Sequence, residues 1–460
     1  MASETVEADV CVIGAGFAGL TAARRLGQAG KSVIVLEARD RVGGRTWTER
    51  RPDGRTVDRG GAWLAPHHDA AFGLAAEVGA TTYKTYVRGA HLLVGDNKLK
   101  RYTGLIPKIS PLAVVSIAFA QRRIDRMAKK VPVDAPWTAP RAAEWDARTV
   151  GSLLESTHIR SRIGYDLFEM AVRGLFAAPD LNDVSLLDLL FLVHAHKSIE
   201  SLFSIEGGSQ ENLVDGGLGG LAETVAAQLD EPVRLGAPVR AVRQSDDRVV
   251  VEADGVSVTA AYVVVTVPPA LALEITFDPV LTDDRQTLYR RAVAGVETKT
   301  MVVYDEPFWR TDGFSGQTAE PGSAVEVSID ASPSDGAYGV LAAFSFGRVA
   351  ETIDRLPPTE RRQAVIDALT ARYGVKAGAP SDYVETSWWA EPWSRGCSMA
   401  HFPPGTLTRY GPLLREPFGR VHWAGTETST TSHGAVDGAI RSGERAAQEI
   451  LEPRATTHPD

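Results

Sequence analysis

The chain has 460 residues, which exceeds the size of one ordinary hydrophobic core and predicts two or three domains. Hydrophobic residues make up 44% and charged residues 23%, a composition that excludes a disordered or fibrous protein. The formal net charge is -9 and no dense run of Lys or Arg occurs, which excludes an obvious nucleic-acid-binding surface.

The sequence also predicts a cellular setting. Only two cysteines are present, Cys11 and Cys397, and their distance in the sequence favours a reducing compartment over a disulfide framework. The acidic N-terminus lacks the features of a secretory signal, and the longest apolar runs, 112–120 and 186–193, are too short to span a bilayer. We expect a cytoplasmic protein without a membrane partner, as a monomer or a homodimer.

Three glycines follow the first expected strand, 8–13, and precede a helical segment. In this order Gly14 makes a tight turn, Gly16 lets a pyrophosphate approach the backbone, and Gly19 lets the helix pack against the strand. The helix N-terminus then holds the phosphates. The segment therefore predicts a dinucleotide-binding turn.

A second strand is expected at 32–36 and ends at Glu37. The Glu37 carboxylate can accept hydrogen bonds from both hydroxyls of a ribose, and it disfavours a 2′-phosphate. The sequence continues through Ala38, Arg39, Gly43, Gly44 and Arg45. The glycine pair permits contact between the backbone and a diphosphate, and the last arginine supplies a charge-assisted donor.

The segment from Glu37 to Arg45, EARDRVGGR, resembles the flavin amine oxidase family, in which it follows the second strand and wraps FAD. The resemblance implies that Ala38, Arg39, Gly44 and Arg45 contact FAD, and that Gly60 and Gly61 form the next flavin-facing glycine pair. It also implies an α/β fold, in which an FAD-binding Rossmann-type domain of the glutathione-reductase and amine-oxidase kind accompanies a mixed α+β substrate domain.

The order of the expected elements indicates a discontinuous FAD-binding domain. Long amphipathic helical stretches run from about residue 107 to 197, and strand signals return at 233–242, 248–252, 256–259 and 262–267, with a turn at 254–255. We expect the FAD-binding domain to comprise 1–85, 207–285 and 391–452, and the substrate domain to comprise 86–206 and 286–390. A flexible tail is expected at 453–460.

Two residues in the middle of the chain are singled out by the resemblance. Val239 falls where family members hold the adenine with a valine backbone, although an ordinary strand valine fits equally well. Lys299 lies in a strand-like run whose alternation places it beside apolar residues, where lysine is rare. The family pattern implies an ammonium that is linked through water to flavin N5 and that assists electron transfer to oxygen. The alternative is a solubilising lysine on an edge strand.

The C-terminal segment resembles the family most closely, in Trp388, Cys397, Gly425, Thr426, Glu427, Ala435 and Val436. The resemblance implies that the Val436 amide, at the start of the last helix, donates to the flavin pyrimidine. Cys397 sits where several members attach the flavin through a thioether, and Arg395, if close, would lower the pKa of its thiol. The alternative for Cys397 is inert packing.

Two positions depart from the family pattern. Family members usually carry an aromatic residue just after the cysteine and another just after the glycine of the last helix, and these form a cage for the amine. Here the two positions are Ser398 and Ala435. His401 and His433 are gained nearby and Trp388 is retained, so a histidine base acting on an alcohol or an activated C–H is an alternative.

The function predicted first is an FAD-dependent oxidase that transfers hydride from a C–H next to an amine nitrogen to flavin N5. Oxygen would reoxidise the flavin to give hydrogen peroxide, and the imine would hydrolyse. With small residues in both cage positions, we expect a bulkier or more polar substrate than a simple arylethylamine. The alternatives are an FAD-dependent oxidase or dehydrogenase of an alcohol or activated C–H, and a silent FAD-bound scaffold. No spacing typical of metal ligands is present.

Overall fold

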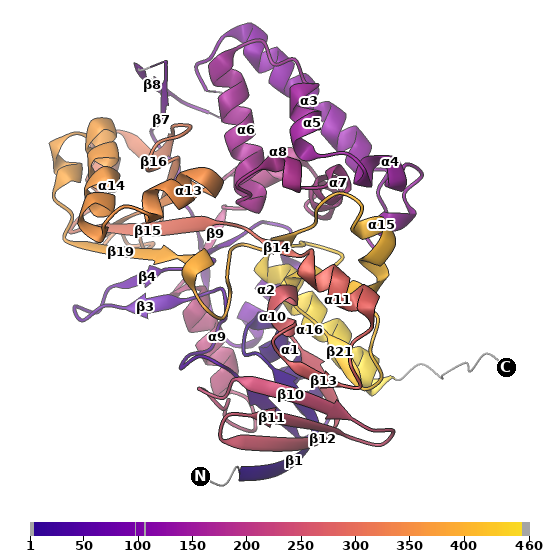
Figure 1. Ribbon diagram of the computed structural model, residues 1–460. Coiled ribbons are helices and arrows are strands. Elements are labelled where there is room, and N and C mark those ends of the chain that lie inside the picture. The colour runs from indigo at the N-terminus through magenta and orange to yellow at the C-terminus, as the bar shows by residue number, and fades with distance from the viewer. Residues whose placement is uncertain (1–3, 97, 105–106, 453–460) are drawn as a thin grey trace.

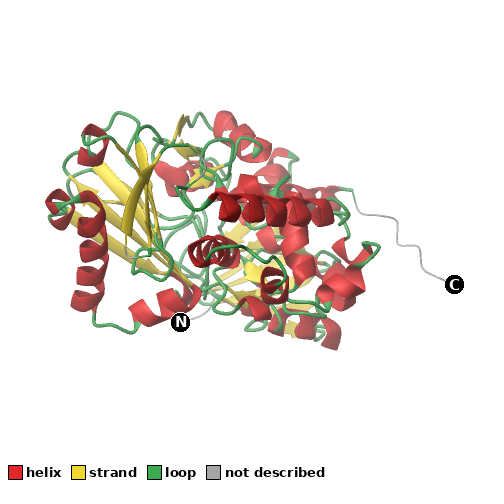
Figure 2. Cartoon of the chain, turned by 90° about the horizontal axis from the view of Figure 1, so that it is seen from above, coloured by secondary structure: helices red, strands yellow, loops and turns green. Residues whose placement is uncertain are grey.

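The computed structural model describes residues 4–96, 98–104 and 107–452, and the expected tail, 453–460, lies outside them. Two seven-stranded sheets organise the described chain, and segment 111–203 forms a group of helices above them (Figure 1). Seen from above, the strands fall into two groups with helices along their outer sides (Figure 2). None of the described helices is long and apolar enough to span a membrane.

The first sheet draws its strands from distant parts of the chain. They are β1 (Glu4–Ile13), β2 (Val33–Leu36), β10 (Val239–Gln244), β11 (Val249–Ala253), β12 (Val256–Val265), β13 (Thr276–Asp278) and β21 (Val421–Trp423). β1 lies between β2 and β12 and is parallel to both. Val10 and Val12 pack into one core, and Cys11 and Ile13 into another. This burial on both faces explains why the strand is continuously apolar.

β12 corrects the expected strand boundaries. The sequence predicts two strands, at 256–259 and 262–267, but the structure has a single strand, because residues 4–8 and 10–13 of β1 pair along its whole length. Its second half pairs on the other side with β21, at residues 263–265. The predicted turn at Asp254 and Gly255 is confirmed, whereas the strand expected from residue 233 begins only at Val239.

The second sheet carries β15 in its interior. Its strands are β19 (Asp382–Ser387), β15 (Glu297–Tyr304), β18 (Gly339–Phe346), β17 (Val327–Asp330), β16 (Phe314–Ala319), β7 (Ala90–Gly95) and β8 (Lys98–Tyr102). Every residue of β15 is buried, and Met301 and Val303 pack on the face opposite to Val302. Since alternate residues share a face, Lys299 points to the same side as Met301.

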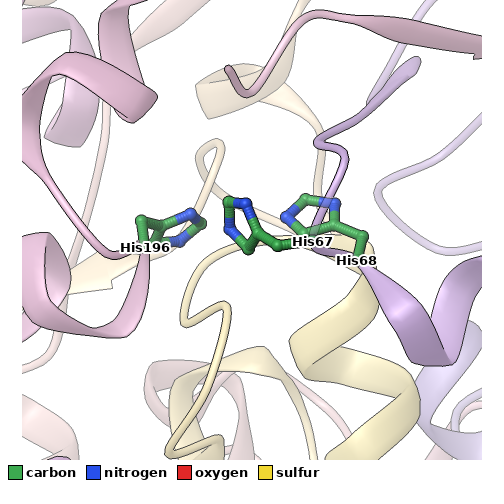
Figure 3. Close-up of side chains that lie close together, drawn as sticks. All are labelled: His67, His68 and His196. Atoms are coloured by element: carbon green, nitrogen blue, oxygen red, sulfur yellow. The ribbon is translucent and has the colours of Figure 1, made fainter. Parts of the chain in front are cut away.

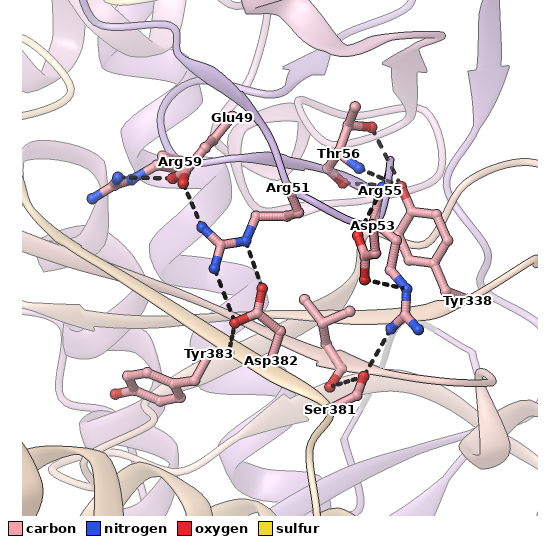
Figure 4. A network of polar contacts seen from close by, with 11 residues as sticks. Glu49, Arg51, Asp53, Arg55, Thr56, Arg59, Tyr338, Ser381, Asp382 and Tyr383 are labelled. Carbon is pink, nitrogen blue, oxygen red and sulfur yellow. Dashed lines mark hydrogen bonds and ion pairs between the residues drawn. The ribbon is translucent and has the colours of Figure 1, made fainter.

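A hairpin from the first part of the chain is held against the second sheet (Figure 4). It consists of β3 (Thr48–Arg50) and β4 (Thr56–Asp58). Arg51 forms an ion pair with Asp382 in β19, with 2.6 Å between Nε and Oδ2, and Arg55 donates a hydrogen bond to Ser381 Oγ at 2.8 Å. These contacts fix the loop after β4 beside β15.

Helices complete both parts. α1 (Phe17–Gln28) and α16 (Val436–Leu451) pack together on the first sheet, and α14 (Pro358–Tyr373) packs on the second. The helical group consists of α3 (Pro111–Ala128), α4 (Ala142–Asp146), α5 (Val150–Glu155), α6 (Arg162–Phe176), α7 (Leu186–Ala195) and α8 (Ile199–Phe203). The other helices are α2 (Asp69–Glu77), α9 (Gly217–Ala227), α10 (Pro269–Ala272), α11 (Asp283–Arg290), α12 (Phe308–Thr311), α13 (Gly347–Asp354) and α15 (Leu407–Tyr410).

Short strands join separate segments between these layers. They are β5 (Trp63–Leu64), β6 (Thr82–Lys84) and β9 (Asn212–Val214) in one sheet, and β14 (Val293–Ala294) and β20 (Ala400–His401) in another.

Candidate active site

The turn between β1 and α1 lines a cavity of about 190 Å³. Gly14 and Gly16 are in its wall. A Cβ atom on Gly16 would find Gly44 Cα as its nearest neighbour, at 3.9 Å, so a side chain there would extend into the cavity. A Cβ atom on Gly19 would instead lie 1.9 Å from the Gly14 carbonyl oxygen, so this glycine lets the helix pack against the turn and does not line the cavity.

Glu37 ends β2 in the wall of the same cavity and is buried. The amides of Ala15 and Arg39 donate hydrogen bonds to its two carboxylate oxygens, at 2.8 and 3.0 Å. The Arg39 guanidinium is held in turn by Ser394 Oγ, at 2.8 Å. Ala38, Arg39 and Val239 also line the cavity. The carboxylate is therefore fixed where a ribose hydroxyl could donate to it.

Arg45 lines the cavity and is held there by an ion pair with Glu427. Its guanidinium donates to both carboxylate oxygens, at 2.6 and 3.0 Å, and to the Ser398 carbonyl oxygen at 2.8 Å. Burial opposes ionisation of Glu427, but Arg45 outweighs this effect and holds the pKa of the carboxyl below its usual range. Glu427 does not itself line the cavity, so it positions Arg45 from behind.

The start of α16 forms another part of the wall. Gly425, Thr426, Ala435 and Val436 line the cavity, and Thr426 Oγ1 donates a hydrogen bond to the Ala435 carbonyl oxygen at 2.9 Å. A helix N-terminus presents unpaired N–H groups and the positive end of the helix dipole. This wall is suited to a group that becomes negatively charged.

A second cavity, of about 480 Å³, meets the first. The residues that line both are Gly61, Cys397, Ser398, Gly434, Ala435 and Val436. Most of the second wall is apolar and comes from α6, α8 and strands β15 to β18, and its buried ionisable groups include Glu297 and Lys299. A planar group at the junction would be bound by the first cavity and would face the second.

Lys299 projects from β15 into the second cavity and is buried. Its Nζ donates a hydrogen bond to the Gly60 carbonyl oxygen at 2.6 Å and lies 4.9 Å from the centre of the Trp63 ring. Burial lowers the pKa of Lys299 to about 8, although Asp58 and Glu297 favour its charged form. Gly60 lines only this second cavity.

Cys397 lies at the junction of the cavities and is buried. Burial raises the pKa of its thiol well above the ordinary value, and Glu297 adds to this effect. Arg45 and Lys299 are the cations that oppose it. The expected role of Arg395 is wrong, because its guanidinium is half-exposed and forms an ion pair with Glu274.

The other residues expected to be catalytic lie in different places. His433 lines the second cavity, its ring centre 4.8 Å from that of Phe191, and burial lowers its pKa to about 4. His401 lines neither cavity. It belongs to β20, and its ring packs near Phe176. Trp388 also lines neither, since its indole N–H donates to the Arg59 carbonyl oxygen at 2.9 Å and its ring packs behind Gly60.

Several wall residues are missing from the sequence prediction. Trp63 and Phe344 lie beside the Lys299 ammonium, and Glu297 is a carboxyl in the wall with its pKa raised by burial to about 7. The signal available for Glu297 is its spacing, since it lies two residues before Lys299 and shares its face of the strand. Ser398 and Ala435 line both cavities, so the positions of the expected aromatic cage are open.

The first cavity fits FAD. Three of its features match the phosphates and ribose of a dinucleotide. They are a glycine turn that a Cβ atom would obstruct, a fixed carboxylate and a guanidinium. The helix N-terminus at the junction matches the end of a flavin that gains negative charge on reduction. The residues that line the first cavity come from three separated segments of the chain, at residues 13–61, 237–275 and 393–439.

Comparisons with known proteins agree with this site. The family model described as flavin containing amine oxidoreductase matches residues 17–451. A Mycobacterium tuberculosis protein named as a flavin-containing monoamine oxidase is 38% identical, with 96% of each chain covered. Horse flavin-containing amine oxidase A is 35% identical over 96% of this chain and 85% of its own.

A solved structure, wild-type putrescine oxidase bound to putrescine, superposes with a TM-score of 0.93. It is 31% identical, and the match covers 97% of this chain and 99% of that one. The fold is therefore that of an FAD-dependent amine oxidase, with a Rossmann-type FAD domain and a substrate domain. The chain belongs to the flavin-containing amine oxidoreductase family, and it is an oxidoreductase with FAD as its cofactor.

Proposed function

We propose that the protein is an oxidase that removes a hydride from the carbon next to an amine nitrogen. The product is an imine, which water hydrolyses to a carbonyl compound and an amine. When bound, FAD accepts the hydride at N5 and passes the electrons to oxygen, which leaves as hydrogen peroxide. The observation that carries the proposal is the junction where a mostly apolar cavity of about 480 Å³ opens onto the cofactor cavity.

Residues from each segment would hold the cofactor. Gly14, Gly16 and Arg45 would bind the diphosphate, and Glu37 would accept hydrogen bonds from the ribose. Val239 would contact the adenine, and the α16 N-terminus would donate to the pyrimidine. Cys397, at the junction, would bond to the flavin ring. Apart from the junction residues, which line both cavities, the residues that would hold the cofactor differ from those that would face the substrate.

Lys299 is the residue proposed to assist the oxygen reaction. Its ammonium is buried at the junction side of the second cavity and is fixed by the Gly60 carbonyl. A positive charge in a low-dielectric wall stabilises the negative charge that oxygen acquires when it takes an electron. Trp63 and Phe344 flank the ammonium, and the lysine is buried among them.

The amine must also be neutral when it reacts in the second cavity. An ammonium has no lone pair to stabilise the cation that hydride removal leaves. We propose that Glu297 takes the proton of an incoming ammonium at its carboxylate. Its pKa, raised by burial to about 7, lies closer to that of an amine than an ordinary carboxyl does. The apolar wall further favours an uncharged amine.

The substrate is proposed to be an amine bulkier or more polar than a simple arylethylamine. Ser398 and Ala435 leave room at the junction, where the family pattern implies aromatic walls. The similar proteins are named for monoamines and for putrescine, which supports an amine with an aliphatic carbon next to nitrogen.

One observation favours a second candidate. Both ring nitrogens of His433 lack a hydrogen-bond partner among the described residues, and the ring lines the second cavity. A neutral imidazole there could take a proton from an alcohol or an acidic carbon.

Matched substrates separate the two candidates. Purified holoprotein is mixed anaerobically with amines and with alcohols of the same carbon skeletons, and loss of the oxidised flavin absorbance is recorded. Bleaching by amines alone, followed by peroxide release on admission of oxygen, is the expected result. Bleaching by alcohols alone would replace the proposal with the second candidate, and bleaching by amines without peroxide would make the enzyme a dehydrogenase.

A further inference from the structure

Three histidines from two distant parts of the chain come together beside the second cavity (Figure 3). His67 and His68 immediately precede α2, and His196 follows α7. Their ring centres are 5.0 to 6.1 Å apart. His68 and His196 are buried and line the cavity, while His67 is half-buried. The sequence gives no hint of this cluster, because 127 residues separate its two parts.

Each ring has a nitrogen without a hydrogen-bond partner among the described residues. These atoms are Nε2 of His67, Nε2 of His68 and Nδ1 of His196. One nitrogen from each ring can be chosen so that all three lie within 4.8 Å of one another. Leaving buried polar atoms unpaired costs free energy, so a cluster of this kind is suited to a ligand.

We propose that His67, His68 and His196 bind one divalent metal ion of the zinc(II) class. Three imidazole nitrogens without a carboxylate favour a borderline ion over magnesium or calcium, which prefer oxygen. The rings of His68 and His196 are buried, and an apolar surrounding disfavours the charged imidazolium form. A neutral imidazole is the form that binds a metal.

His196 is already oriented for coordination. Its Nε2 donates a hydrogen bond to the His433 carbonyl oxygen at 2.8 Å, which leaves the Nδ1 lone pair free. Metal-binding histidines usually hold their second nitrogen in this way. The same bond joins the cluster to the segment that leads into α16, so an ion here would sit on the wall that faces the substrate.

Two adjustments must accompany binding. Nitrogens around a tetrahedral zinc lie about 3.4 Å apart, so the rings must approach one another, and His67 is the least buried of them. His68 Nδ1 accepts a hydrogen bond from the Ala65 amide at 3.0 Å, which places the ring proton on Nε2. Coordination through Nε2 therefore moves this proton to Nδ1 and breaks the bond to Ala65.

Direct metal binding tests the proposal without reference to the reaction. FAD-loaded protein without a histidine tag is freed of metal with a chelator and titrated with zinc chloride by calorimetry. About one ion per chain should bind, and His67→Ala should weaken binding by about 100-fold while the flavin spectrum stays unchanged. Nitrogen-15 NMR of the rings should show the His68 proton moving from Nε2 to Nδ1.

The matched control is His194→Ala, since His194 is also half-buried, lies in α7 and has Nδ1 bonded to the Val131 carbonyl oxygen. It should leave zinc binding unchanged. Absence of binding, or equal weakening by both substitutions, would overturn the metal site. Either result would leave the proposed amine oxidation standing, because that is measured by flavin bleaching.

Discussion

The two cavities recognise their occupants by different means. The cofactor cavity has parts lined by glycines, at the turn after β1, at the Gly43-Gly44 pair and at Gly434 before α16, beside the side chains of Glu37 and Arg45. The second cavity is formed by side chains from helices and from the second sheet. Backbone recognition demands glycines at fixed spacing, whereas a wall of side chains can be rebuilt one residue at a time. Cofactor and substrate choice are therefore separable in this protein.

The largest effect should follow from placing a side chain in the glycine turn of the cofactor cavity. Gly16→Leu places a side chain in the cofactor cavity, so the protein should fold but purify without FAD and without yellow colour. Gly73→Leu is the control, because Gly73 is an exposed helical glycine whose Cβ would meet nothing within 4 Å. A yellow Gly16→Leu protein would contradict the difference between the two cavities, since the glycine turn would then tolerate a side chain.

Replacing Lys299 should have a smaller effect than Gly16→Leu, and it should slow only one of the two half-reactions. Lys299→Met should slow flavin reoxidation by about 100-fold, on the order of 3 kcal/mol, because it removes one preorganised charge. Reduction by the amine should change far less. Rapid mixing measures the two steps separately, with the exposed Lys197→Met as control. Equal slowing of both steps would limit Lys299 to shaping the cavity.

The pH dependence of reoxidation should sharpen this assignment. The pKa of Lys299 is lowered to about 8, so the ammonium is present below this pH and is lost as the pH rises through it. Reoxidation should therefore fall above pH 8, approaching about tenfold per unit. Lys299→Met should be slow and flat over the same range. A wild-type rate that rises above pH 8 would contradict a catalytic ammonium.

Ala435→Tyr tests whether the substrate wall can be rebuilt. A tyrosine there would confine small amines at the junction, and an aromatic contact of about 1 kcal/mol predicts an increase in kcat/KM of about fivefold. Ser398→Tyr, in the other open position, should act in the same direction. Loss of FAD from either variant would show that cofactor and substrate recognition are not separable at the junction.

The smallest expected effect on turnover concerns Cys397. If the Cys397 thiol is bonded to the flavin, as we propose, acid precipitation of the wild type should leave the yellow colour in the pellet, and Cys397→Ala should release it to the supernatant. The distribution of absorbance between pellet and supernatant is the measurement. A white wild-type pellet would make Cys397 a packing residue at the junction.

β1 and β2 of the first sheet could be predicted because their signals are local, although β1 begins at Glu4 and not at residue 8. The run ADVCVI and the glycines after it lie within a dozen residues, and β2 follows as expected at Val33–Leu36. The single strand β12 could not be predicted, because its continuity depends on pairing with β1, some 250 residues away. The three-residue strand β21 likewise depends on its partner β12.

The site residues show the same difference between local and long-range sequence signals. Motif spacing identified Gly14, Gly16 and Glu37, strand alternation and the family pattern identified Lys299, and the structure brings these four residues to the two cavities. Trp388 and His401 resembled site residues by their position in a motif, but their side chains pack behind the walls. The cluster of His67, His68 and His196 had no sequence signal, since only folding brings α7 beside the start of α2.

The pairing of β12 also determines when the cofactor site can form during synthesis. Residue 4 pairs with residue 256, residues 263–265 pair with 421–423, and the last wall of the cavity begins at Val436. Because the chain grows from its N-terminus, all residues up to Ala439 must leave the ribosome before this cavity can close. FAD can therefore be captured in the closed cavity only after the start of α16 has emerged, although β1 can pair with β2 and β12 earlier.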